Sequence, residues 1–256
     1  MLHLWSAGRS DSFCDVTTTN RKKLTDNLAA VRERIAAACG RVKRRPQEVR
    51  LVAVTKSASL AAIKELVSLG QEDLAESRVQ QLTQRAEELA AWRAKLESPL
   101  PPERWHMVGQ LQRNKVKACI AVAQTIHSVD SLRLAEEISL RAQRDNRQLD
   151  LLLEVNCSEE SQKSGVAVGA AVHLAEQVST LKAIRLVGLM TMAPLVANAE
   201  QARFTFVRLR ELFEEAQHEK IGGRNFDQLS MGMSNDFEVA IEEGATIVRI
   251  GTALFQ

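Results

Sequence analysis

The fold of this chain is decided by the stretch Phe226-Asp227-Gln228-Leu229-Ser230-Met231-Gly232-Met233-Ser234-Asn235-Asp236, Phe237-Glu238-Val239-Ala240-Ile241, Gly244 and Ile247-Val248-Arg249-Ile250-Gly251-Thr252. Its first part predicts a short strand that ends in a loop of glycine and serine. This loop leads into a helix whose N-cap is Ser234 or Asp236. Gly244 fits the C′ position that ends the helix, and a second apolar strand then ends in Gly251-Thr252.

Small residues with hydroxyl groups thus follow two consecutive strands, and one of the two loops leads into a helix. Free backbone N–H groups at such a place attract an anion, usually a phosphate group. In a (β/α)8 barrel, the phosphate site commonly follows strands 7 and 8. The stretch therefore predicts the last quarter of such a barrel, together with a phosphate-binding site.

Length and composition agree with one globular domain of this kind. The 256 residues match the typical size of a (β/α)8 barrel, and 45% hydrophobic with 26% charged residues is ordinary. A formal charge of +2 is too small to predict nucleic acid as the main partner. No apolar run has membrane-spanning length. The scattered cysteines predict reduced thiols in a cytoplasmic protein, with no disulfide framework and no zinc site: Cys14, Cys39, Cys119 and Cys157.

The first nineteen residues lack the basic start and the long apolar core of a signal peptide. We expect a flexible leader over residues 1–19 and a single domain over residues 20–256. A helix from about Asn20 to Cys39 opens this domain, because its apolar residues recur at intervals of four and three and form one stripe: Leu24, Leu28, Val31, Ile35 and Ala38.

Apolar segments of strand length alternate with helical patterns along the rest of the chain. The opening stretch supplies the last two strands, and six more are predicted at 50–56, 73–77, 104–109, 125–130, 151–156 and 185–191. Such alternation predicts an α/β protein with a parallel sheet, and eight units predict closure into a (β/α)8 TIM-type barrel. The N-terminal helix is expected to cover the gap after the eighth strand.

Lys56 ends the first predicted strand, at the end of the barrel where active sites lie. Burial there would lower the pKa of the amine, and a neutral amine can form a Schiff base with a carbonyl group. The alternative is a lysine that only extends from the barrel mouth into solvent. One reactive lysine beside a phosphate site favours pyridoxal 5′-phosphate (PLP) as the ligand.

Arg249 lies in an apolar strand, two residues before Gly251. A buried arginine needs a partner, and either an interior carboxylate of Glu76 or Glu154 or the pyridine nitrogen of PLP could provide it. The spacing alone leaves both partners of Arg249 open.

The histidines show no metal-ligand spacing. His106 and His127 lie on strands and are expected to support the interior by packing or hydrogen bonds.

Several segments together resemble the pyridoxal phosphate homeostasis protein family, a PLP-binding barrel of fold type III related to the alanine racemase barrel. They are Leu51-Val52-Ala53-Val54-Thr55-Lys56, Trp105-His106-Met107-Val108-Gly109-Gln110-Leu111-Gln112-Arg113-Asn114-Lys115, Gly188-Leu189-Met190-Thr191-Met192, Leu229-Ser230-Met231-Gly232-Met233-Ser234-Asn235-Asp236 and Val248-Arg249-Ile250-Gly251-Thr252.

The resemblance implies that Lys56 holds PLP as a Schiff base and that Arg249 lies near the pyridine nitrogen. Ser234, Gly251 and Thr252 match the family's phosphate cradle, with Ser230 and Met233 beside it. The chain departs from the family pattern at Ala75-Glu76-Ser77, where the family usually has Gly-Glu-Asn, at Gln110, where it usually has histidine, and in lacking a glycine after the last phenylalanine.

Two kinds of function fit these residues. The expected one is a monomeric PLP-binding protein that buffers or delivers PLP with little or no turnover, influences amino-acid pools, and has apo PLP enzymes as candidate recipients. The alternative is a PLP-dependent amino-acid racemase or decarboxylase. A two-base racemase needs a proton carrier on each face of the substrate carbon. The related racemases add a C-terminal β domain whose tyrosine, reaching across a dimer, acts as the second base, whereas this chain has no tyrosine and we expect no such domain. A nucleic-acid binder using Arg113, Lys115 and Lys117 is a third, less favoured possibility.

Overall fold

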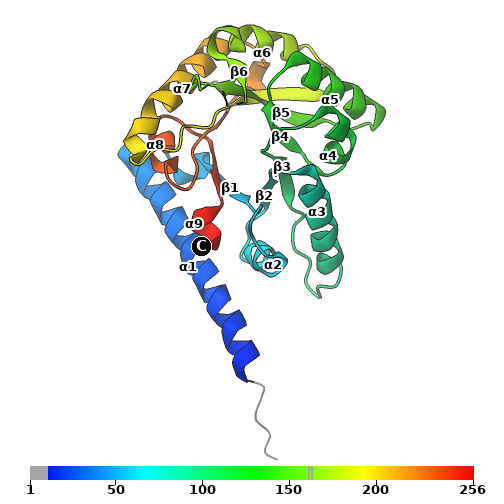
Figure 1. Cartoon of the computed structure of the whole chain (residues 1–256), viewed down its shortest axis with the longest axis vertical. Helices are drawn as coiled ribbons and strands as arrows, with labels where there is room; N and C mark the ends of the chain where they lie inside the picture. Colours follow the sequence, from blue (N-terminus) through cyan, green and yellow to red (C-terminus); the bar gives the residue numbers. More distant parts are fainter. Residues whose placement is uncertain (1–10, 161, 163) are drawn as a thin grey trace, which may run out of the picture.

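The computed structural model describes residues 11–160, 162 and 164–256, and of residues 11–20 the backbone alone. In this part of the chain, eight parallel strands close into a barrel with helices around the outside (Figure 1). The predicted (β/α)8 barrel is confirmed. In their order around the barrel, the strands are β1 (Arg50–Val54), β2 (Asp73–Glu76), β3 (Arg104–Met107), β4 (Thr125–Val129), β5 (Leu149–Asn156), β7 (Ile184–Met190), β8 (Gln228–Ser230) and β9 (Ile247–Ile250).

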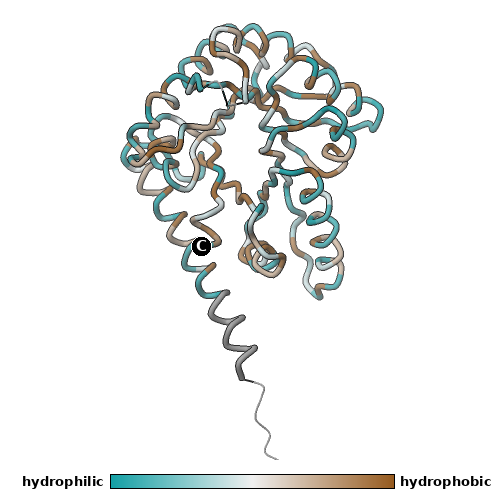
Figure 2. The backbone as a smooth tube through the Cα atoms, in the orientation of Figure 1, coloured by the Kyte–Doolittle hydropathy of each residue, from teal (hydrophilic) through white to brown (hydrophobic). Residues whose placement is uncertain are grey.

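The helices between the strands bury their apolar faces against the outside of the barrel, which places most of the core between the strands and the helices. Figure 2 shows the resulting alternation of hydrophobic and hydrophilic segments around the barrel. Ser59 caps the first of these helices, because its hydroxyl accepts a hydrogen bond from the backbone N–H of Ala62. The helices between strands are α2 (Leu60–Ser68), α3 (Val79–Arg93), α4 (Val116–Val122), α5 (Leu132–Arg144), α6 (Ala171–Ser179), α7 (Arg203–His218) and α8 (Phe237–Glu242), and the short helix α9 (Thr252–Phe255) follows the last strand.

Helix α1 (Asp11–Arg41) packs against α8, α9 and α2, and so covers the barrel between its last and first units (Figure 1). The five residues of its predicted apolar stripe are all buried. The helix begins at Asp11 and not at Asn20, because residues 11–20 contain no glycine or proline that would end it. Residues 11–19 of the predicted leader thus belong to α1, and residues 1–10 lie outside the described residues.

The segment after β5 contains a strand that the sequence does not indicate. Residues Val166 and Ala167 form β6 (Val166–Ala167), which pairs in parallel with the end of β5. A strand of two residues is too short to produce an alternating pattern, so the sequence predicts only a loop there.

Two strands carry register irregularities. On β4, the four residues from Ile126 to Val129 match the three residues from Leu151 to Leu153 of β5, which places His127 in the irregular part. On β7, Val187 is the extra residue between Leu186 and Gly188. Such bulges change the side-chain direction along a strand. Gly188 allows β8 to approach closely, because a Cβ at this position would lie 1.7 Å from the carbonyl oxygen of Gln228.

We predict that Gly188→Ala lowers the free energy of unfolding by about 3 kcal/mol or more, because the added methyl group must separate β7 from β8. Urea unfolding monitored by circular dichroism measures this change. Gly169→Ala is the matched control, because no atom lies within 4 Å of a Cβ at that position. Equal stabilities of the two variants would contradict the prediction.

Candidate functional site

Lys56 lies at the barrel mouth, in the loop between β1 and α2. Its side chain is exposed, so the expectation that burial removes water from the amine is wrong. The loop itself is held by Arg85 of α3, which donates hydrogen bonds to the carbonyl oxygens of Thr55 at 2.6 Å and Ala58 at 3.0 Å. Sequence reasoning missed Arg85, although its position three residues after Leu82 places it beside the apolar stripe of α3.

Glu76 is a buried carboxylate beside this loop. Thr55 donates a hydrogen bond to Glu76 Oε1 at 2.6 Å, and Arg85 forms an ion pair with the same oxygen at 3.2 Å. Oε2 is buried without a hydrogen-bond partner in the described part of the chain. Burial raises the pKa of Glu76, and the hydrogen bond from Thr55 and the charges of Arg85 and Lys56 oppose this rise. The carboxylate therefore supports the Lys56 loop and keeps one oxygen unsatisfied beside it.

The loops after β8 and β9 are tied to each other. Ser234 Oγ accepts a hydrogen bond from the backbone N–H of Ala253 at 3.2 Å. Asp236, one of the two predicted residues, is the N-cap of α8, and its carboxylate accepts a hydrogen bond from the backbone N–H of Met233 at 2.6 Å. Gly232 permits the sharp turn with a φ of +93°, since a Cβ there would lie 2.7 Å from Ala240 Cβ.

These two loops present free backbone donors. Within the described residues, no hydrogen bond is made by the backbone N–H groups of four residues, and none of the four is buried: Ser234, Asn235, Gly251 and Thr252. Backbone N–H groups in such loops favour an anion. The donor set therefore fits a phosphate group, as the opening stretch of sequence predicts.

Arg249 is buried in the barrel interior, at 4% exposure. It donates hydrogen bonds to Ser230 Oγ at 2.6 Å and to the carbonyl oxygen of Thr191 at 2.9 Å. Neither predicted carboxylate lies within ion-pair distance of it in the described part of the chain. Burial lowers the pKa of Arg249 to about 10, and the charges of Glu154 and Asp236 oppose this. The guanidinium group therefore stays charged near neutral pH.

His106 and His127 are both buried inside the barrel below Arg249, and they contact each other through their ring nitrogens. The expected role of these residues in interior hydrogen bonding is confirmed. Burial lowers the pKa of both imidazoles and positive charges nearby lower it further, while the Asp73 carboxylate opposes this at His106. Both rings are therefore neutral near pH 7.

The structure brings the predicted site residues to one end of the barrel. Lys56 follows β1, which pairs with β9, and β9 pairs with β8. Gly251 closely approaches β1, since a Cβ there would lie 3.1 Å from the carbonyl oxygen of Val54. Ser230 differs from the others because it is fully buried beneath the loops.

Of the departures from the family pattern, Ser77 is half-buried and Gln110 is exposed.

Other kinds of site find no support in the described residues. No group of three or more His, Cys, Asp or Glu side chains is placed to hold a metal ion there. None of the helices in the same part of the chain combines the length and hydrophobicity needed to cross a membrane.

Glu154 generates a prediction on pH dependence. Burial raises its pKa to about 7, and the charge of Arg249 opposes this rise. A pKa above the ordinary value means that the folded state binds more protons than the unfolded state, so stability falls as the pH rises from about 4.5 to about 7. Glu154→Gln removes this titration. We expect the parent to lose about 2–3 kcal/mol relative to the variant over that range.

Urea unfolding of both proteins at intervals from pH 5 to pH 8 tests the prediction, and groups shared by the two proteins cancel in the difference. A stability difference that does not change with pH would show that Glu154 titrates as an ordinary glutamate.

Comparison with known sequences identifies clear relatives. The family model described as alanine racemase, N-terminal domain, matches residues 20–256. A pyridoxal phosphate homeostasis protein of Aquifex aeolicus is 41% identical over 230 residues, which are 90% of this chain and 96% of the relative. The Escherichia coli K12 protein of the same name is 35% identical over 236 residues, 91% of this chain and 95% of the relative.

Solved structures give the same relationship. PipY of Synechococcus elongatus, solved with PLP bound, is 32% identical with a TM-score of 0.77, covering 91% of this chain and 100% of that one. An alanine racemase of Clostridium difficile shares only the fold, with 16% identity, a TM-score of 0.68 and coverage of 91% of this chain and 56% of that one. This chain therefore belongs to the family of the alanine racemase N-terminal domain and, within it, to the pyridoxal phosphate homeostasis proteins.

Proposed function

We propose that this chain binds PLP and serves intracellular PLP homeostasis, holding the cofactor as a Schiff base on Lys56. The observation that carries the proposal is the convergence of three features at one end of the barrel: the Lys56 amine, the free N–H groups of two adjacent loops, and the buried guanidinium group of Arg249. The related PipY structure with PLP bound supports the choice of ligand.

Each feature fits one part of the cofactor. The loop donors of Ser234, Gly251 and Thr252 would hold the phosphate group, with Met233 beside them. Lys56 is exposed at the mouth and would meet the aldehyde of bound PLP without rearrangement of a packed interior. Arg249 can only donate hydrogen bonds, so it suits a pyridine nitrogen that accepts one and carries no proton. Bound PLP supplies an electron-withdrawing ring, which is weaker when its nitrogen is not protonated.

The state of the interior side chains favours a carrier over an enzyme. A racemase needs a second proton carrier. Both ring nitrogens of His106 and of His127 are occupied by hydrogen bonds inside the barrel. Cys157 is buried, and burial raises the pKa of its thiol to about 11. We therefore propose a monomeric cytoplasmic protein that stores PLP and releases it to apo PLP enzymes. The alternative remains an amino-acid racemase or decarboxylase.

Reduction with borohydride tests the attachment of PLP. We predict that borohydride fixes a pyridoxyl group on Lys56, and that peptide mass mapping finds it there. Lys56→Ala should leave no reduced adduct, because no other lysine follows the strand that borders the phosphate loops. Lys115→Ala is the control, since Lys115 lies in the segment between β3 and α4 and should not change labelling. An adduct on another lysine in the parent protein would contradict the proposal.

Turnover separates the two functions. We predict no substantial racemase or decarboxylase activity on common amino acids, because His106 and His127 are neutral, buried and already hydrogen-bonded. Exchange of the substrate α-proton and change in optical rotation measure this directly. A kcat of about 1 per second or more, in the usual enzyme range, would favour the enzyme alternative, with Glu154 as the first base to examine. Transfer of PLP to an apo-enzyme without such turnover would support the carrier.

A further inference from the structure

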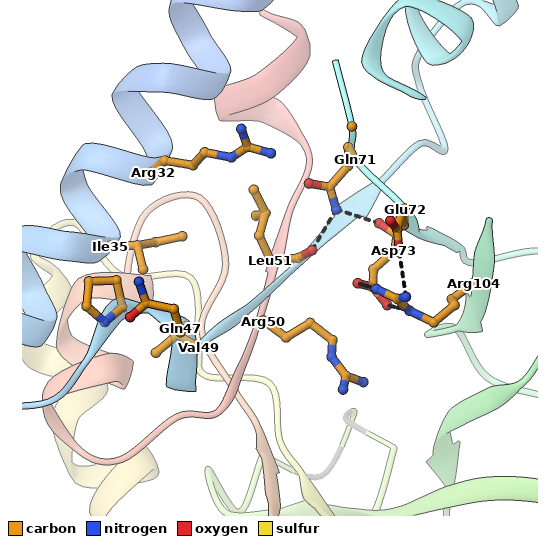
Figure 3. Close-up of a pocket in the computed structure, with 12 residues that line it drawn as sticks. Arg32, Ile35, Gln47, Val49, Arg50, Leu51, Gln71, Glu72, Asp73 and Arg104 are labelled. Atoms are coloured by element: carbon orange, nitrogen blue, oxygen red, sulfur yellow. Dashed lines mark hydrogen bonds and ion pairs between the residues drawn. The ribbon is translucent and has the colours of Figure 1, made fainter. Parts of the chain in front are cut away.

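A continuous chain of hydrogen bonds runs through the barrel interior from the start of β3 to Arg249. At its lower end, Arg104 donates to both carboxylate oxygens of Asp73, from Nε at 2.9 Å and from Nη2 at 2.6 Å (Figure 3). His106 Nε2 lies 3.0 Å from Asp73 Oδ1. His106 Nδ1 then lies 2.9 Å from His127 Nε2. The lower end of the chain lines a pocket at the opposite end of the barrel from Lys56.

The upper half of the chain crosses the barrel. His127 Nδ1 lies 2.8 Å from Ser230 Oγ, which accepts the hydrogen bond from Arg249. His127 lies on β4 and Ser230 on β8, and these strands are not neighbours in the sheet. The hydrogen bonds therefore join side chains on opposite walls of the interior, where burial excludes water.

The Asp73 end of the chain, with neutral imidazole rings, determines the direction of the bonds above it, and the Arg249 end is compatible with that direction. The guanidinium group of Arg249 can only donate, so Ser230 Oγ accepts from it and can donate its own hydrogen onward. The carboxylate of Asp73 can only accept, so His106 must carry its hydrogen on Nε2.

A neutral imidazole carries one hydrogen, so His106 Nδ1 accepts from His127 Nε2–H. His127 Nδ1 then accepts from the hydroxyl group of Ser230. The acceptor end thus requires, and the donor end allows, one arrangement: both histidines carry their hydrogen on Nε2.

We propose that Asp73, His106 and His127 are positioning residues for Arg249, because they direct the Ser230 hydroxyl hydrogen away from the guanidinium group and leave an oxygen lone pair facing it. Arg249 is thereby held by two acceptors, Ser230 Oγ and the carbonyl oxygen of Thr191. None of the three positioning residues lies in the loops that form the mouth. Their effect on cofactor binding rests on the proposed PLP function, whereas the direction of the chain does not.

The charges around the histidines favour this arrangement over one with an extra proton. His106 faces the carboxylate of Asp73, but Arg50 and Arg104 lie nearby, and His127 faces Arg249 and Arg50. A proton added to His106 would reverse the two bonds above it. Ser230 would then accept from both His127 and Arg249, and its own hydrogen would lose its present acceptor.

Nuclear magnetic resonance of the apo-protein tests the direction of the chain in the unmodified sequence. With ¹⁵N-labelled histidine, long-range ¹H–¹⁵N spectra distinguish hydrogen on Nδ1 from hydrogen on Nε2. We expect both His106 and His127 to be neutral Nε2–H tautomers near pH 7. The signals are assigned by their loss in His106→Phe and His127→Phe. A His127 with hydrogen on Nδ1, or a charged ring at either position, would overturn the inference.

PLP titration tests the positioning role. We expect His106→Phe to weaken PLP binding about tenfold, because the loss of one buried link frees the Ser230 hydroxyl hydrogen to turn toward Arg249. Ser139→Ala is the matched control: it removes a buried hydrogen bond of 2.7 Å to the Lys182 carbonyl oxygen, outside the barrel interior. It should lower stability without changing PLP affinity.

PLP affinity of His106→Phe equal to that of the parent would contradict the positioning role. A parent protein that binds no PLP would contradict the proposed function instead, and the tautomer measurement on the apo-protein would still decide the direction of the chain.

Discussion

The buried guanidinium group of Arg249 imposes the constraint on which the interior of this protein depends. A charge removed from water costs several kcal/mol unless hydrogen bonds replace its hydration. No ion pair supplies this compensation among the described residues; a serine hydroxyl and a backbone carbonyl do so. The carbonyl belongs to Thr191, just beyond β7, and the bulge at Val187 adjusts the course of that strand. The one buried cation on β9 thus has its hydrogen-bond acceptors on β8 and just beyond β7.

The mouth of the barrel is built on a different basis, with loops that hydrogen-bond to one another before any ligand arrives. Arg85 holds the Lys56 loop, Asp236 closes the turn after β8, and Ser234 joins that turn to the loop after β9. Groups that are already in place lose little conformational entropy on binding. The free N–H groups of these loops can therefore receive an anion without first being ordered.

Storage and catalysis make different demands on such an interior. A catalytic base must be able to gain and lose a proton near the reacting carbon. The two histidines in the barrel are engaged at both nitrogens, and their burial disfavours the charged form. Side chains of this kind hold a neighbour in one position more readily than they transfer protons. The interior thus agrees with the proposed role of holding a cofactor with little turnover.

The sequence by itself determined the barrel and the ends of its strands, because both depend on patterns within single elements. Alternating apolar segments predicted eight strands, and residues just beyond or near strand ends, such as Lys56, Arg249 and Ser234, were correctly assigned to one end of the barrel. The exposure of Lys56, the hydrogen-bond acceptors of Arg249 and the clamp by Arg85 were not predicted. Each of these depends on which side chains meet across the fold.

Only the tertiary structure decided the interior hydrogen-bond chain. His127 and Ser230 are 103 residues apart, and they meet because β4 and β8 lie on opposite walls of the closed barrel. The short strand β6 forms only because β5 lies beside it. Sequence periodicity records the environment within one helix or strand. It cannot record bulges or contacts between strands on opposite walls, since these follow from the closure of the whole barrel.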